Sequence, residues 1–207
     1  MAKENHLTQN QTKGRSKNEG TRSFAASFRT VEGEGNERRR ILSFSSETPV
    51  QRWFGAEILD HSPGAIDMSR LEEIGVVLFN HHRDRVLGKI HRAWVEDGRG
   101  CAEIEFDDDA ETEVVFQKVA NETLRTTSVG YRVDAFETVK TGSTSTDGRF
   151  AGPCDVARKW TPYEISIVSV PADATVGVGR EMDVIGGAPT LETYEKQIQV
   201  NKNYVGG

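Results

Sequence analysis

The stretch Thr126-Thr127-Ser128-Val129-Gly130-Tyr131-Arg132-Val133 says most about the fold. Its side chains divide between two faces, with Thr127, Val129, Tyr131 and Val133 on one and Thr126, Ser128, Gly130 and Arg132 on the other. This two-residue period predicts a β-strand that continues to Glu137. Ser128 is expected on the polar face, beside a glycine that leaves room for a substrate backbone. A lone serine in such a place is more often a solvent-facing residue than a nucleophile.

Short strands are predicted on either side of this stretch. Apolar or alternating residues occupy 40–45, 53–59, 76–79, 87–95, 101–106 and 163–170. The segments 87–95 and 101–106 are expected to form a hairpin, because Asp97-Gly98 between them is a strong turn signal. One helix is predicted over 108–124, and Asp67 is expected to cap a short helical turn. The pattern indicates an α+β fold: a closed or nearly closed β structure with helices packed outside.

The two ends of the chain differ in composition from its middle. Residues 1–36 are polar and contain glycine, which predicts a mostly unstructured leader. Residues 182–207 are polar again and are predicted to form a flexible tail. A single domain over 37–181 remains, of a size that one hydrophobic core can serve.

The composition argues against several classes of protein. The 207 residues are 36% hydrophobic and 28% charged, with a formal net charge of -6. No stretch approaches the roughly 20 apolar residues that cross a bilayer, so no membrane is expected. The negative charge, without a basic stripe, argues against nucleic acid as a ligand. Cys101 and Cys154 have no nearby cysteine and predict reduced thiols rather than a zinc site or a disulfide. No cofactor is expected.

Hydrolysis by a serine requires a base within hydrogen-bond reach of its hydroxyl. His81 follows the apolar run 76–79 almost directly, so it is expected at the end of a rigid strand, a good place to hold a base. His82 is its neighbour, and if the strand continues the two rings point to opposite faces. Structural roles are more typical of His61, in a predicted turn, and His91, in a predicted strand.

Glu164 lies in the otherwise apolar strand 163–170. A carboxylate among buried neighbours is normally paired. Its partner is either a histidine, whose tautomer it fixes, or an arginine or lysine in a salt bridge, and the residues alone leave both readings open.

A metal site is the other chemistry that these histidines raise. His81, His82, Asp84 and His91 are the available ligands. Adjacent histidines on a strand diverge, and no helical HExxH motif places two of them on one face. No metal is therefore expected.

Five short pieces, taken in order, resemble the HK97-family prohead proteases. They are Ser43-Phe44-Ser45-Ser46-Glu47-Thr48-Pro49, Phe54-Gly55-Ala56-Glu57-Ile58-Leu59, Leu78-Phe79-Asn80-His81 with Gly88, Thr127-Ser128-Val129-Gly130-Tyr131, and Glu164 through Ala172. Together they span roughly residues 38–180. The resemblance implies a serine endopeptidase with a fold similar to the herpesvirus assemblins, an assemblin-like β-barrel with surrounding helices.

The resemblance also implies a role for each site residue. Ser128 matches the family's serine, and the Asn-His step at Asn80 favours His81 over His82 as the base. Glu164 is the expected third residue, although assemblins use a second histidine there.

The family acts inside the immature phage shell. Its members cut the scaffolding segment from the major capsid protein and then cut themselves. The implied partners are therefore the capsid protein with its scaffolding segment and further copies of the chain. The implied location is the procapsid, in the cytoplasm of the host of a phage or prophage. The competing hypothesis is a catalytically silent scaffold or interaction protein with the same fold, and the presence of both Ser128 and His81 argues against it.

Overall fold

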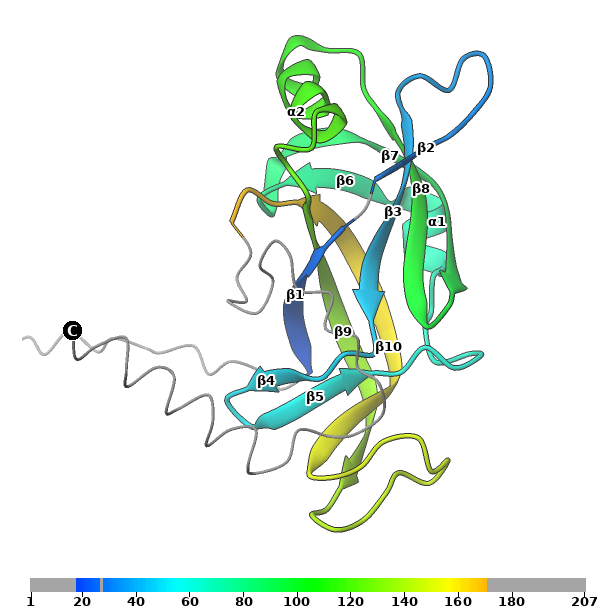
Figure 1. Ribbon diagram of the computed structural model, residues 1–207, viewed down its shortest axis with the longest axis vertical. Helices are drawn as coiled ribbons and strands as arrows, with labels where there is room; N and C mark the ends of the chain where they lie inside the picture. Colours follow the sequence, from blue (N-terminus) through cyan, green and yellow to red (C-terminus); the bar gives the residue numbers. More distant parts are fainter. Residues whose placement is uncertain (1–17, 27, 171–207) are drawn as a thin grey trace, which may run out of the picture.

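The computed structural model describes residues 18–26 and 28–170, drawn in colour in Figure 1. The predicted tail over 182–207 lies outside the described residues, as does half of the predicted leader, residues 1–17 and 27. The described elements are, in order, β1 (Glu19–Ala25), β2 (Arg29–Thr30), β3 (Arg39–Ser46), β4 (Val50–Arg52), β5 (Gly55–Leu59), α1 (Ser69–Ile74), β6 (Val76–Phe79), β7 (His82–Glu96), β8 (Arg99–Phe106), α2 (Ala110–Ala120), β9 (Thr126–Val139) and β10 (Cys154–Ile167).

A single ten-stranded sheet makes up most of the structure. Its strands follow the order β1-β9-β10-β6-β7-β8-β3-β2, with β5 paired to β10 and β4 paired to β5. The sheet curls so that β3 approaches β9, where Thr127 Oγ1 donates a hydrogen bond of 2.8 Å to the carbonyl oxygen of Ser43. The result is a half-barrel with two short helices, and Figure 1 shows α2 beyond one end of the long strands. The prediction of an α+β fold with a closed or nearly closed β structure is therefore confirmed in part: the structure is mostly β with two short helices, and its sheet is curled into a half-barrel.

The core lies on the inner side of the curled sheet. Val129, Tyr131 and Val133 of β9 are buried there, so the alternation predicted for this strand is confirmed. Trp160 from β10 is also buried, and its indole nitrogen donates to the carbonyl oxygen of Asp60 at 2.8 Å. This core holds β9 and β10 side by side, and these two strands supply two of the three expected site residues.

Part of the predicted leader is an ordered strand, so the expectation of an unstructured segment over 1–36 is wrong for β1. This strand pairs with β9 along its whole length. Arg22 is buried and donates to the carboxylate of Glu57 at 3.1 Å and to its carbonyl oxygen at 2.6 Å. Burial alone would raise the pKa of Glu57, but the Arg22 charge and hydrogen bonds from Tyr131 and Arg52 hold it below its ordinary value. The leader composition concealed the strand because the partner of Arg22 lies 35 residues away.

The hairpin predicted across Asp97-Gly98 is present. It joins β7 to β8, and both turn residues have positive φ, 50° and 68°. This is the backbone that a two-residue hairpin turn requires. However, β7 begins at His82, earlier than the predicted start at residue 87, because its first residues pair back onto β6.

The helix α2 is shorter at both ends than the predicted helix over 108–124. The helix α1 begins at Ser69, and its N-cap residue is Met68 rather than the expected Asp67. For α2, the Asp109 side chain accepts hydrogen bonds from the backbone N–H groups of Glu111 and Thr112 and so fixes the first turn. Asp67 accepts from the backbone N–H of Ser69 at the start of α1. Neither helix in the described part of the chain has the length and apolar character needed to cross a membrane.

Candidate active site

Ser128 occupies the third position of β9, between two neighbouring strands of the sheet. It lies opposite Ser23 of β1 and opposite Ser166 of β10. The residue is fully buried, with 0% exposure. The expectation of a surface-facing serine is therefore wrong, because the outer face of β9 is covered at this point. Its hydroxyl nevertheless has a partner, the ring of His81.

His81 lies in the turn that joins β6 to β7. Phe79 pairs with His82, so Asn80 and His81 are the two central residues of a two-residue hairpin turn. Their φ angles are 52° and 61°, in the left-handed region that few residues other than glycine adopt. His81 Nε2 lies 2.9 Å from Ser128 Oγ. The prediction that this histidine emerges from the end of a buried strand is confirmed. The contact with Ser128 is made by His81, whereas His82 is exposed.

Glu164 approaches the other side of the same ring. Its Oε1 is hydrogen-bonded to Nδ1 of His81, and its side chain is 12% exposed. An irregularity in the pairing of β10 with β9 falls between Pro162 and Glu164, next to the position where the carboxylate leaves the sheet. Within residues 18–26 and 28–170, no arginine or lysine forms an ion pair with Glu164. Of the two readings left open by the sequence, the structure therefore favours the histidine partner.

Gly130 has a different role from the one expected of it. A Cβ atom built on this residue would lie 2.6 Å from Cγ of Glu164 and 2.7 Å from a ring carbon of Tyr163. The space above the glycine is therefore filled by the protein's own side chains and not left open for a substrate backbone. The missing side chain allows Glu164 to cross β9 toward His81.

These contacts define the chemistry that the three residues can perform. A carboxylate accepts hydrogen bonds, so in the neutral imidazole of His81 the proton lies on Nδ1, which donates a hydrogen bond to Glu164. Nε2 is then unprotonated and accepts the hydrogen bond of the Ser128 hydroxyl. This hydrogen-bond pattern is the one required for a histidine to remove a proton from a serine.

A second serine–histidine pair is buried elsewhere in the fold. Ser45 Oγ lies 2.7 Å from Nε2 of His61, while Nδ1 of this ring lies 2.9 Å from the carbonyl oxygen of Leu59. Ser45 is 1% exposed and His61 5%. Burial lowers the pKa of His61 below its ordinary value. Because the ring donates to a neutral carbonyl and is enclosed, this pair fits the structural role expected for His61.

The remaining histidine candidates do not join the site. His91 contacts the carboxylate of Glu105 at 2.6 Å on an exposed part of the sheet. No cluster of three histidine, cysteine or acidic side chains that would hold a metal ion occurs in the part of the chain that the structure describes.

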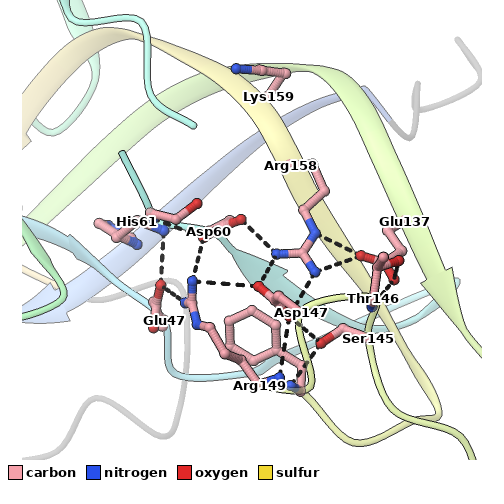
Figure 2. Close-up of polar contacts among 12 residues, drawn as sticks. Glu47, Asp60, His61, Glu137, Ser145, Thr146, Asp147, Arg149, Arg158 and Lys159 are labelled. Atoms are coloured by element: carbon pink, nitrogen blue, oxygen red, sulfur yellow. Dashed lines mark hydrogen bonds and ion pairs between the residues drawn. The ribbon is translucent and has the colours of Figure 1, made fainter. Parts of the chain in front are cut away.

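An ionic network occupies the other end of β9 and β10 (Figure 2). Arg158 contacts the carboxylates of Asp60, Asp147 and Glu137, while Arg149 contacts Glu47 and Asp60. A shallow depression of about 470 Å³ adjoins the network. The two arginines are paired with the carboxylates around them, so the network fastens the loop between β9 and β10 and leaves neither guanidinium free for a ligand.

The part of the chain that contains Ser128, His81 and Glu164 matches a known protein family. Residues 58–185 match the family described as Caudovirus prohead serine protease, a family of peptidases. A curated relative, named major capsid protein and found in Halomonas phage phiHAP-1, is 37% identical over 164 residues. The alignment covers 77% of this chain and 26% of that relative, so the chain spans about a quarter of the relative's length. No solved structure matches the chain. The family match covers more than half of the sequence, and the chain therefore belongs to the Caudovirus prohead serine protease family.

Proposed function

We propose that the chain is a serine endopeptidase in which Ser128 is the nucleophile, His81 the general base and Glu164 the residue that orients the histidine. The observation that carries this proposal is the continuous hydrogen-bonded series from Ser128 Oγ through both nitrogens of His81 to Glu164. Each of the three residues comes from a different segment, so their meeting at one point depends on the fold.

The proposed reaction proceeds in two stages. Ser128 Oγ attacks the carbonyl carbon of the scissile peptide bond as its proton passes to Nε2 of His81. The Glu164 carboxylate stabilises the imidazolium that forms. His81 then gives this proton to the leaving amine, and an acyl-enzyme remains on Ser128. A water molecule, deprotonated by the same ring, releases the acyl group and restores the serine.

The buried position of Ser128 sets a condition on this mechanism. With the residue 0% exposed, no substrate carbonyl reaches its Oγ in the arrangement described. The His81 side chain, in contrast, is 31% exposed. Substrate entry therefore requires local movement of the atoms that cover Ser128, on the histidine side of the site.

The substrate that fits best is the major capsid protein with its scaffolding segment. The family description places its members in the prohead, and a relative of this chain carries the name major capsid protein. A peptidase similar in sequence to part of a capsid protein is expected to meet capsid subunits inside the procapsid, together with further copies of itself. We also propose an assemblin-like arrangement for the half-barrel.

Self-cleavage is expected before Glu19 or after Arg180. Residues 19–25 are excluded, because β1 is paired with β9 along its whole length and a protease requires an extended, accessible backbone. Mass spectrometry of the active protein and of Ser128→Ala tests this point. Identical termini in the two proteins would remove self-cleavage from the proposal.

The main experiment is cleavage of the capsid protein in vitro. Purified protein is incubated with the capsid protein of the same phage, and the new termini are sequenced. Cleavage is expected with the wild type and with Ser45→Ala, which alters the other serine–histidine pair, but not with Ser128→Ala. Absence of cleavage by all three proteins would favour the catalytically silent scaffold. Cleavage by Ser128→Ala would show that another group is the nucleophile.

A further inference from the structure

The turn that carries His81 differs from the other two-residue turn with positive φ in the same sheet. Asp97-Gly98 joins β7 to β8 with glycine at the second central position. Asn80-His81 joins β6 to β7 with similar backbone angles but has histidine there. A residue with a Cβ is disfavoured in the left-handed region, because the Cβ comes too close to the following carbonyl oxygen. The His81 turn is therefore strained where an ordinary hairpin is not, and other contacts must hold it.

Asn80 makes those contacts. Its backbone N–H donates to the carbonyl oxygen of Ile167 at 2.9 Å. Its side-chain Oδ1 accepts one hydrogen bond from the backbone N–H of Ser169 at 2.9 Å and another from the Ser169 hydroxyl at 3.2 Å. Both partners follow closely after Glu164 on the same strand and its extension. Asn80 thus fastens the turn that carries the histidine to the segment that carries the carboxylate.

We propose that Asn80 is a positioning residue for catalysis: its side-chain amide clamps the His81 turn onto the segment after β10 and so keeps the ring between Ser128 and Glu164. The inference rests on the proposed function of those three residues. Asn80 itself does not touch the reacting atoms. It acts on the backbone of the turn, which would otherwise relax from its left-handed conformation and withdraw the ring.

The chemistry of the amide explains why asparagine suits this position. Asparagine and aspartate adopt the left-handed region more readily than most residues with a side chain. An Oδ1 acceptor is also required, because Ser169 presents two donors. Glycine meets the first requirement and lacks the second, whereas aspartate meets both. These two substitutions therefore separate the backbone conformation from the clamp.

The experiment compares Asn80→Gly and Asn80→Asp in the full chain, with peptide hydrolysis and thermal unfolding measured for each. Asn80→Gly is expected to lower kcat by up to about a hundredfold with little change in KM, because a displacement of about 1 Å in a catalytic group has effects of this size. Asn80→Asp is expected to recover most of that loss, because its Oδ1 accepts the same hydrogen bonds. Asp97→Gly, in the other turn, is the matched control and should retain the kcat of the wild type.

A second readout follows the reactivity of the nucleophile without peptide turnover. Labelling of Ser128 by a fluorophosphonate should slow in Asn80→Gly and recover in Asn80→Asp, while the control Asp97→Gly should label as fast as the wild type. Unchanged kcat and unchanged labelling in folded Asn80→Gly would overturn the inference. So would a loss in Asn80→Gly that is matched by Asp97→Gly, because it would reflect general instability. Ser128→Ala in the hydrolysis assay tests the proposed function separately. Activity in that variant would overturn the triad and the inference that rests on it, whereas an inactive Ser128→Ala beside a fully active Asn80→Gly would overturn the Asn80 inference alone.

Discussion

The described part of the fold contains two serine–histidine hydrogen bonds, and they differ in what lies on the far side of the ring. In the pair Ser128–His81, Nδ1 of the histidine meets the carboxylate of Glu164. In the pair Ser45–His61, Nδ1 meets the neutral carbonyl oxygen of Leu59. Both carbonyl and carboxylate fix the same tautomer, but only the carboxylate stabilises a positive charge on the ring. A serine–histidine contact alone is therefore not evidence of a nucleophile.

The two pairs also differ in how far the histidine ring is exposed to solvent. The His81 side chain is 31% exposed, whereas His61 is buried against Trp160, with the rings 5.6 Å apart in an edge-on arrangement. A base that must exchange protons with a leaving group and a water molecule has to reach solvent. The buried pair instead fills a polar gap in the interior, where each partner satisfies the other.

The largest expected effect is the loss of the Ser128 hydroxyl, and loss of the Ser45 hydroxyl is its matched control. Ser128→Ala is expected to abolish peptide hydrolysis, with a loss on the order of a millionfold for a nucleophile in a cooperating triad. Ser45→Ala should leave hydrolysis almost unchanged and lower the free energy of unfolding by about 1 to 3 kcal/mol, because Nε2 of buried His61 loses its donor. Steady-state kinetics and chemical denaturation of both variants provide the measurements. Residual hydrolysis above a few per cent in Ser128→Ala would contradict the assignment.

Removal of the base should be nearly as damaging as removal of the nucleophile. His81→Ala is expected to reduce kcat almost to the level of Ser128→Ala, because the proton of the hydroxyl then has no acceptor. His82→Ala, one residue further along, serves as the control and should have a mild effect, since His82 is exposed and the Ser128 contact belongs to His81. The reverse ranking in turnover would move the base by one residue and contradict the geometry.

Conversion of the carboxylate to an amide makes the two pairs more alike. Glu164→Gln retains an oxygen acceptor for Nδ1 of His81 but removes the charge, as the carbonyl of Leu59 does for His61. Turnover is expected to fall by up to about ten-thousandfold, with a modest change in melting temperature. Turnover and melting temperature are both measured. Near-normal turnover in the folded variant would remove Glu164 from the site.

A methyl group at residue 130 tests how closely the carboxylate must be held. In Gly130→Ala the new Cβ would lie 2.6 Å from Cγ of Glu164, so that side chain must shift away from His81. The loss in kcat should be up to about a hundredfold. The same substitution in a Glu164→Gln background should cost much less, because the charge it displaces is already gone. Equal losses in the two backgrounds, measured as kcat, would mean that residue 130 acts independently of Glu164.

Part of this arrangement could be predicted from the sequence and part could not, for physical reasons. Local patterns predicted the alternation of β9, the Asp97-Gly98 turn and the emergence of His81 from a buried strand. The pairing of Glu164 with His81 spans 83 residues, and no local pattern encodes such a contact. The ordered strand β1 was missed for the same reason, because Arg22 reads as a solvated charge until Glu57 is placed beside it. Ser128 looked exposed because alternation gives the face of a strand but not what covers it.

The smallest expected effect concerns stability and distinguishes the enclosed His61 from the partly exposed His81 by pH. Burial lowers the pKa of His61 in the folded protein, so between that pKa and the ordinary value of about 6.5 the unfolded chain binds more protons at this residue than the folded chain. Stability contributed by neutral His61 is thus present above the ordinary pKa of about 6.5 and is lost as the pH falls below that value toward the lowered pKa of the folded protein. The charges around the ring oppose one another, since Glu47 and Asp60 raise its pKa and Arg22 lowers it. The free energy of unfolding should therefore decline over this window in the wild type and in Ser128→Ala, and decline less in His61→Gln. Chemical denaturation at half-unit pH steps measures the slopes, and equal slopes in all three proteins would show that His61 is not the group that titrates.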